Sequence, residues 1–283
     1  MSGAANFPEK TWNLGMNWKL SAENPGNPVK TVPARIEKNM DAFNLRSPDA
    51  WESPQIILVI LAHPDDPEFF CGATLVRWIQ AGHEVHYCIL TCGDKGGDPG
   101  LTSGQLCSIR HEEQLKAAAV IGVKSVRFLD REDGYLLPTI DLRRDVVRVI
   151  RQVQPDILVT CDPTNLFARE NYLNHPDHRY AGQVVLDAVF PAAGNGHFFP
   201  ELLKTEGLEP HTPREIWIAL SANPNVSLDV TNTWEKKILA LKEHKSQIGD
   251  PSMFEQRMVS RKAERSTVEK AYYDEKFHVI KYG

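Results

Sequence analysis

The sequence lacks any stretch of about 18 or more apolar residues, the length that a membrane-spanning helix needs. Its amino-terminal segment also lacks the basic start and apolar core of a secretory signal. Without a readable membrane span or signal, we expect a cytoplasmic protein.

A disulfide framework is absent as well. The 283 residues include 5 cysteines, an odd number, and no two of them form a C-x-x-C pair. A chain of this size with so few cysteines does not need cross-links to build a core. We therefore expect reduced thiols, as in a cytosolic protein.

The chain has no excess of positive charge. Its 32 lysines and arginines face 37 acidic residues, which leaves a net charge of -5. No overall positive field attracts a phosphate backbone, so we do not expect generic nucleic-acid binding. The hydrophobic share of 42% is ordinary for a globular protein and is sufficient for a full core.

Two regions differ sharply in texture. Residues 1–53 are rich in proline, asparagine and lysine, and we predict an irregular amino-terminal arm there. Residues 54–283 are expected to form a single α/β domain. The arm carries Trp12, Trp18 and Trp51, which are candidates for lid contacts or for contacts in a homo-oligomer.

Apolar strands alternate with amphipathic helices from residue 56 onward. The run at residues 56–61 is continuously apolar, which is typical of a strand buried on both faces. Further strands are predicted at residues 84–90, 126–129, 157–160, 216–220 and 226–230, and helices at 74–80, 105–120, 142–153, 180–189, 234–248 and 261–276. The last of these helices mixes both charge signs and is expected to be solvated. The alternation predicts a mostly parallel sheet with helices on both faces.

A dense polar cluster follows the first strand. It reads His63-Pro64-Asp65-Asp66-Pro67-Glu68 and brings one imidazole and three carboxylates together. In an open α/β sheet, ligands bind beyond the carboxyl ends of the strands. Such a cluster is costly there unless a cation or a proton neutralises it. The alternative is a solvated loop in which Asp66 or Glu68 caps the next helix.

A second cluster follows the fourth strand and reads His175-Pro176-Asp177-His178. Its histidines are spaced three residues apart at a helix start, so their rings can converge. Alone, they could equally cap and pack that helix. Taken with the first cluster, His63, Asp66 and His178 form a set of two histidines and one carboxylate with room for water, the pattern of catalytic zinc. Iron, manganese and cobalt stay open.

The two clusters together resemble those of the LmbE-like or PIG-L family of zinc-dependent N-deacetylases. Other matching segments are Thr91 to Gly96, Arg110-x-x-Glu113, Asp133-Gly134 and His244-Lys245-Ser246-Gln247. The resemblance implies a Rossmann-like three-layer sandwich with one divalent metal. It also implies removal of an acetyl group from a small molecule of the N-acetylglucosamine type or a related N-acyl amino sugar.

The resemblance also implies roles for individual residues, and Glu68 receives none because Pro67 separates it from Asp66. The expected metal ligands are His63, Asp66 and His178; the general base is Asp65; the oxyanion contact is His175, with Asp177 tuning its charge; and the sugar contacts are Arg110 and Asp133.

Two other functions stay open at this point. One is a metal-dependent amidase that acts on a thiol conjugate or an antibiotic-like N-acyl sugar. The other is a sugar-binding or metal-storing module without turnover. Asp65 favours an enzyme, because a binding module has no use for an unligated carboxylate beside a metal.

Overall fold

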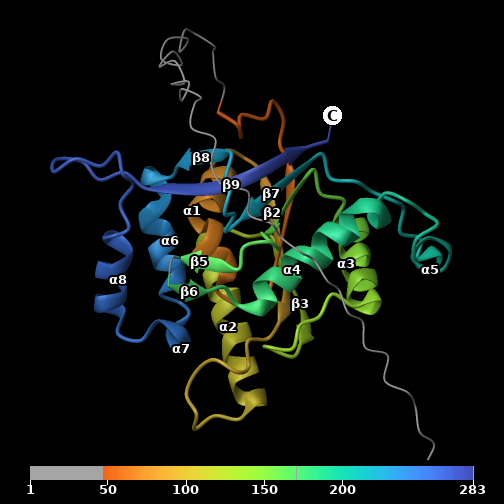
Figure 1. Ribbon diagram of the computed structural model, residues 1–283, viewed down its shortest axis with the longest axis horizontal. Helices are drawn as coiled ribbons and strands as arrows, with labels where there is room; N and C mark the ends of the chain where they lie inside the picture. The colour runs from red at the N-terminus through yellow and green to blue at the C-terminus, as the bar shows by residue number, and fades with distance from the viewer. Residues whose placement is uncertain (1–46, 170, 283) are drawn as a thin grey trace, which may run out of the picture. The chain divides into compact units, whose positions relative to one another are not determined.

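The computed structural model describes residues 47–169 and 171–282, so the predicted arm up to residue 46, including Trp12 and Trp18, lies outside the described residues. A seven-stranded sheet in the order β3-β2-β1-β4-β7-β9-β8 forms the centre of the domain (Figure 1). Its strands are β1 (Ile56–Leu61), β2 (Glu84–Thr91), β3 (Ser125–Arg131), β4 (Ile157–Cys161), β7 (Glu215–Ala219), β8 (Val226–Asp229) and β9 (Asp274–Lys281).

Five neighbouring strands of this sheet run parallel, in the order β3, β2, β1, β4 and β7. Strand β9 is antiparallel to both β7 and β8. Strand β1 lies between β2 and β4, and its successive side chains face opposite layers. Ile57 and Val59 pack in one hydrophobic core, while Leu58 and Ile60 pack in the other. The continuous apolar run is explained by burial on both faces, as predicted.

Helices cover the two faces of the sheet and make three layers (Figure 1). One face packs against α1 (Asp66–Gln80), α2 (Ser103–Ile121), α6 (Trp234–Leu241), α7 (Lys245–Ile248) and α8 (Pro251–Val259). The other face packs against α3 (Ile140–Val153), α4 (Pro176–Asp187), the irregular turns of η1 (Ala188–Ala193) and α5 (Pro200–Lys204). The predicted three-layer, mostly parallel α/β fold is confirmed.

The predicted helix over residues 261–276 is wrong. Helix α8 ends at Val259, the chain then runs without regular structure, and β9 begins at Asp274. Glu275, Phe277 and Val279 alternate inward along β9, and the Glu275 carboxylate lies 2.6 Å from the Lys237 Nζ. Pairing with β7 and β8 therefore overrides a local pattern of mixed charge.

Helix α1 starts earlier than its apolar pattern predicts, at Asp66 rather than at residue 74. Helix α4 begins at Pro176, which agrees with the predicted helix start at the second histidine cluster. Both carry a proline in the first turn, where its missing N–H has no helical partner to lose. These starts place Asp66 and His178 in the first turns of two helices. The predicted helix at 234–248 is divided into α6 and α7.

Residues 47–53, the described part of the predicted arm, pack on the domain. Asp49 accepts hydrogen bonds from Arg77 Nε at 2.8 Å and from Trp78 Nε1 at 3.0 Å. The Trp51 ring lies edge-on to Trp78 and to Trp217, with centroids 5.3 Å and 5.9 Å apart. The boundary at residue 53 stays a prediction.

All five cysteines are unpaired, and four of them are buried. No helix in the described part of the chain is long and apolar enough to cross a membrane.

Candidate metal and active site

A cavity of about 720 Å³ opens at the carboxyl ends of the parallel strands. The polar clusters that follow β1 and β4 both line it, together with segments after β2 and β3. This is the edge of the sheet at which loops and helix amino termini converge in α/β folds. The two predicted clusters therefore share one site.

Three donor groups in this cavity meet closely enough to hold one metal ion. The ligand atoms of His63, Asp66 and His178 lie within 4.8 Å of one another. Asp66 Oδ1 lies 3.1 Å from His178 Nε2, and Asp66 Oδ2 lies 3.4 Å from His63 Nδ1. Two imidazole nitrogens and a carboxylate suit zinc and related divalent metals, so the residues present fit such an ion.

The outer nitrogen of the His63 ring is held by two carboxylates. His63 Nε2 lies 3.1 Å from Asp133 Oδ1 and 3.3 Å from Asp177 Oδ2. A hydrogen on Nε2 satisfies these acceptors and leaves the Nδ1 lone pair facing Asp66. Carboxylates that orient a metal-binding histidine in this way are common behind metal ligands.

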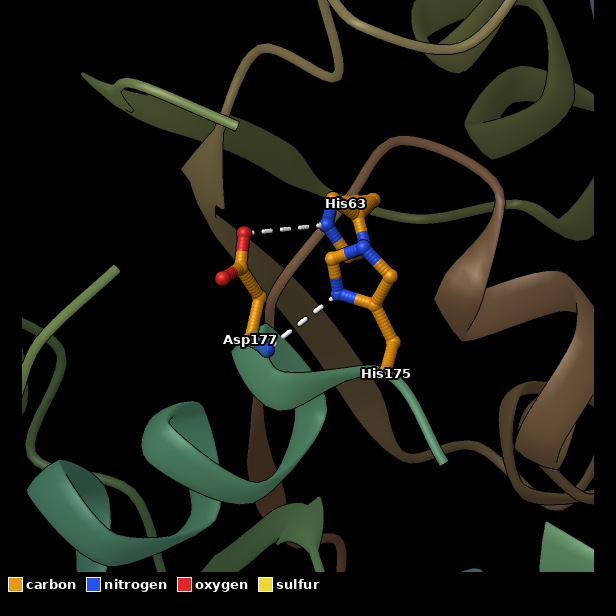
Figure 2. A group of neighbouring side chains, drawn as sticks. All are labelled: His63, His175 and Asp177. Atoms are coloured by element: carbon orange, nitrogen blue, oxygen red, sulfur yellow. Dashed lines mark hydrogen bonds and ion pairs between the residues drawn. The ribbon is translucent and has the colours of Figure 1, made fainter. Parts of the chain in front are cut away.

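Asp177 is fully buried and tied to the backbone. Its Oδ2 accepts a hydrogen bond from Gly134 N at 2.7 Å, and its Oδ1 accepts one from Leu136 N at 3.3 Å. Figure 2 shows the Asp177 carboxylate turned toward His63, while the Asp177 backbone nitrogen faces the His175 ring. Although His63, His175 and Asp177 also bring donor atoms within 4.8 Å, both Asp177 oxygens already have backbone partners. The set of His63, Asp66 and His178 is therefore the better candidate for a metal ion.

The charges around His63 favour a cation at this point. Burial alone would lower the pKa of His63, but the nearby carboxylates of Asp66, Asp133 and Asp177 raise it well above its usual value. Burial would raise the pKa of Asp66, yet His178 and His63 lower it strongly. The cluster thus stabilises positive charge, which a proton or a metal ion can supply.

The other metal-facing histidine is oriented by its own helix entry. His178 Nδ1 lies 2.9 Å from Asn174 Oδ1, so an N–H on Nδ1 leaves Nε2 free to face Asp66. The ring also packs edge-on against Phe70 at 5.1 Å between centroids. Asn174, directly before the histidine motif, is a positioning residue that the sequence analysis did not identify.

Asp65 directly precedes Asp66 in the chain, but it belongs to none of the candidate metal-donor groups found among the described residues. Its backbone has a φ of 92°, a left-handed conformation that few side chains adopt. The Asp65 N–H donates to Gln114 Oε1 at 2.8 Å, and its carboxylate lies 3.2 Å from Arg110. Burial raises the pKa of Asp65 to about 6, and the charge of Arg110 opposes that rise.

Arg110 and Asp133, the expected sugar contacts, both line the cavity. The buried Arg110 guanidinium donates to the Gly93 carbonyl at 2.8 Å and to the Pro64 carbonyl. Asp133 accepts a hydrogen bond from Lys95 N at 3.1 Å, and His63 lowers the pKa of Asp133 to about 2 against the effect of burial. Except for Arg110 Nε, which is buried without a hydrogen-bond partner, the polar atoms of these side chains have protein partners. Contact with a sugar stays a prediction.

His175 caps α4 and borders the cavity at the same time. Its Nδ1 accepts a hydrogen bond from Asp177 N at 3.2 Å, which leaves the hydrogen of a neutral ring on Nε2. Burial and the charge of His63 lower the pKa of His175, while the charge of Asp177 raises it. Both the capping role and a donor role are therefore open to this one ring.

Glu68, to which the resemblance gave no role, belongs to a buried hydrogen-bond network next to Asp65. Glu68 is fully buried and accepts hydrogen bonds from Gln114 Nε2 at 3.1 Å, and His244 Nε2 lies 3.2 Å from it. Gln114 in turn holds the Asp65 backbone. Glu68 therefore supports the loop that carries Asp65. The sequence analysis singled out His244 but did not predict its contact with Glu68.

A short hairpin forms part of the cavity rim and was not predicted. It consists of β5 (Phe167–Arg169) and β6 (Tyr172–Leu173), and Ala168 and Tyr172 line the cavity. Strands of two or three residues are too short for an alternating pattern to be readable.

The chain is similar to known proteins in sequence and in structure. The family model described as GlcNAc-PI de-N-acetylase, PIG-L, matches residues 58–189. A diacetylchitobiose deacetylase of Thermococcus kodakarensis is 33% identical over 192 residues, which cover 68% of this chain and 69% of that relative. A 4-oxalmesaconate hydratase of Pseudomonas putida is 27% identical over 208 residues, 69% of this chain and 76% of that relative.

A solved structure shares the architecture. The N,N'-diacetylchitobiose deacetylase from Pyrococcus horikoshii superposes with a TM-score of 0.71 at 28% identity, over 80% of this chain and 84% of that one. The matched segment 58–189 contains most of β1, all of β4 and both histidine clusters. The chain therefore belongs to the PIG-L family of de-N-acetylases.

Proposed function

We propose that this chain is a metal-dependent hydrolase that removes an N-acetyl group from an N-acetylglucosamine-type or related amino sugar. The observation that carries the proposal is the meeting of His63, Asp66 and His178 around one point, with the Asp65 carboxylate directly beside them. The activities named for the similar deacetylases support this substrate class.

A divalent metal held by His63, Asp66 and His178, zinc by our preference, would polarise the acetamide carbonyl and lower the pKa of a water molecule. Asp65 takes the proton of that water as general base and later delivers it to the departing amine. Arg110, 3.2 Å from the carboxylate, favours its ionised form and restrains its position.

His175 supplies a donor for the oxyanion. With Nδ1 accepting from the backbone, the neutral ring presents an N–H from Nε2, and its lowered pKa keeps the ring neutral near pH 7. A donor already held in place by its own hydrogen bond stabilises developing charge without reorganisation.

The cavity walls suit a saccharide. Phe69, Phe70 and Tyr172 provide apolar surface, and Lys95 and Asp133 provide polar groups. Sugar rings present apolar faces and hydroxyl edges, which match such a mixture. A thiol conjugate or an antibiotic-like N-acyl sugar would use the same metal centre.

Release of acetate from a panel of N-acyl compounds tests the proposal. We expect N,N'-diacetylchitobiose or N-acetylglucosamine to yield acetate and free amine in equal amounts. A larger yield from an N-acetylated thiol conjugate would move the substrate class to the amidase alternative. Saccharide binding without acetate release from metal-loaded protein would contradict the proposal and indicate a binding module.

The hydratase relative provides a second candidate function, since it shows sequence similarity over 76% of its own length. That candidate is tested on the same preparation by measuring the addition of water to an unsaturated dicarboxylate, which is monitored as a loss of ultraviolet absorbance. We expect no turnover.

His175→Ala is expected to lower kcat by about 100-fold or more, because it removes an oxyanion donor, and to cost about 1 kcal/mol of stability through the lost cap. His175→Asn separates the two effects, since asparagine is a good N-cap. We expect its thermal midpoint to match the wild type while kcat stays low. Recovery of kcat in His175→Asn would leave His175 with a capping role alone.

Asp177→Asn is expected to weaken metal binding by roughly 10- to 100-fold, the usual effect of removing a group that orients a metal ligand. The new amide would also place an N–H against a backbone N–H or turn away from His63. A chelator-competition titration measures the change. Asp162→Asn is the matched control, because Asp162 is also buried but bonds to Thr164 and Ser221 instead; equal affinities in both variants would contradict the prediction.

A further inference from the structure

A second cluster of potential metal donors lies between α2 and the end of β3, and none of its members lines the cavity described above. Cys107 and His111 occupy successive turns of that helix, and Asp130 lies near the end of β3. Cys107 Sγ lies 3.8 Å from His111 Nε2, which lies 2.9 Å from Asp130 Oδ1. All three donor atoms are within 4.8 Å of one another.

The three side chains are held in this arrangement by their surroundings. The His111 ring stacks on Phe128, with centroids 3.9 Å apart and an interplanar angle of 23°. Asp130 has a φ of 50°, a left-handed backbone that is uncommon outside glycine. Cys92, directly after β2, interacts with Cys107, which together with burial raises the pKa of the Cys92 thiol. Contacts from three elements thus direct these groups to one point.

The spacing is close to what a tetrahedral ion requires. With zinc bonds of roughly 2.0–2.3 Å, neighbouring nitrogen, oxygen and sulfur ligands lie roughly 3.3–3.6 Å apart. Two of the three observed separations, 3.8 Å and 2.9 Å, differ from these values by about half an ångström or less, and the third is within 4.8 Å. Small side-chain rotations would bring all three atoms into coordination.

We propose that Cys107, His111 and Asp130 bind a second divalent metal ion of the zinc type. A thiolate, an imidazole and a carboxylate favour zinc or cobalt over magnesium and calcium, which prefer oxygen ligands. Metal binding would release the thiol proton to solvent as the Cys107 sulfur becomes a thiolate ligand.

The ion would have a structural effect. It would join α2, which carries Arg110, to the end of β3, three residues before Asp133. None of the three ligands lines the large cavity. We therefore expect the second ion to raise the thermal midpoint and to leave turnover unchanged, whatever reaction the first site performs.

Cobalt distinguishes the two sites, because His63, Asp66 and His178 contain no sulfur. Reduced, metal-free wild-type protein is titrated with Co²⁺, and absorbance and bound metal are recorded. We expect two ions per chain and a near-ultraviolet sulfur-to-cobalt charge-transfer band. Cys107→Ser and His111→Ala should each lose the band and one ion, whereas His63→Ala should lose one ion and keep the band.

His86→Ala is the matched control, since His86 Nε2 also lies 2.9 Å from a carboxylate, that of Glu84, without a thiol nearby. It should keep both ions and the band. One ion per chain and no band in the wild type would overturn the proposal, and that measurement needs no variant to fold. A band that persists in Cys107→Ser would also overturn it, whereas acetate release by that variant tests the proposed function separately.

Discussion

Asp65→Asn is expected to lower kcat by roughly 10²- to 10⁴-fold, the usual effect of removing a general base, and to leave the metal in place. Asparagine has nearly the same shape but cannot accept the proton of the attacking water. It also tolerates the left-handed backbone that Asp65 adopts at a φ of 92°. The fold should therefore survive, and steady-state kinetics with elemental analysis measure both quantities on one sample.

Asp162→Asn serves as its control, because it removes a buried carboxylate at the same sheet edge that lies outside the cavity lining. Its kcat should be close to that of the wild type. Undiminished turnover in metal-loaded Asp65→Asn would contradict the base assignment. Glu68 could not easily replace Asp65, since it is fully buried and engaged with Gln114 and His244.

His178→Ala is expected to abolish metal binding at the first site and reduce acetate release to the level of chelator-treated wild type. Only His63 and Asp66 would remain, and two protein ligands rarely hold zinc. The ring is partly exposed at the start of α4, so secondary structure should persist. Circular dichroism and elemental analysis check these two expectations.

His86→Ala is again the matched control and should keep full metal content and turnover. Full occupancy of the first site in His178→Ala would remove His178 from the ligand set. His175 would then be the next candidate, because its ring lies 4.7 Å from that of His63.

Much of the fold could be predicted from local patterns. The run at residues 56–61 is apolar at every position, and β1 is buried on both faces in the structure. The carboxyl ends of parallel strands meet at one edge, so two clusters about 110 residues apart in the chain could be expected to converge. The residue types in the two clusters also indicated which donors would meet. The ligand atoms of His63, Asp66 and His178 lie within 4.8 Å of one another.

The remaining features depend on long-range contacts that no local pattern encodes. The backbone N–H of Asp65 donates to the side chain of Gln114, which lies in α2. Gln114 in turn donates to the Glu68 carboxylate in α1. The hydrogen position on His175 depends on a backbone N–H at the start of α4. The mixed charges of segment 261–276 suggested a solvated helix. Its last residues form β9 instead, because they pair with β7 and β8.

In the proposed function, the cluster of His63, Asp66 and His178 holds a metal ion that N-deacetylation requires. The most direct test follows acetate and free amine from N,N'-diacetylchitobiose with wild-type protein, before and after chelation and after readdition of Zn²⁺ or Co²⁺. We predict equal yields of both products, loss on chelation and recovery with metal. No acetate from fully metal-loaded protein, or acetate release that chelation leaves unchanged, would show that this metal is not needed for deacetylation.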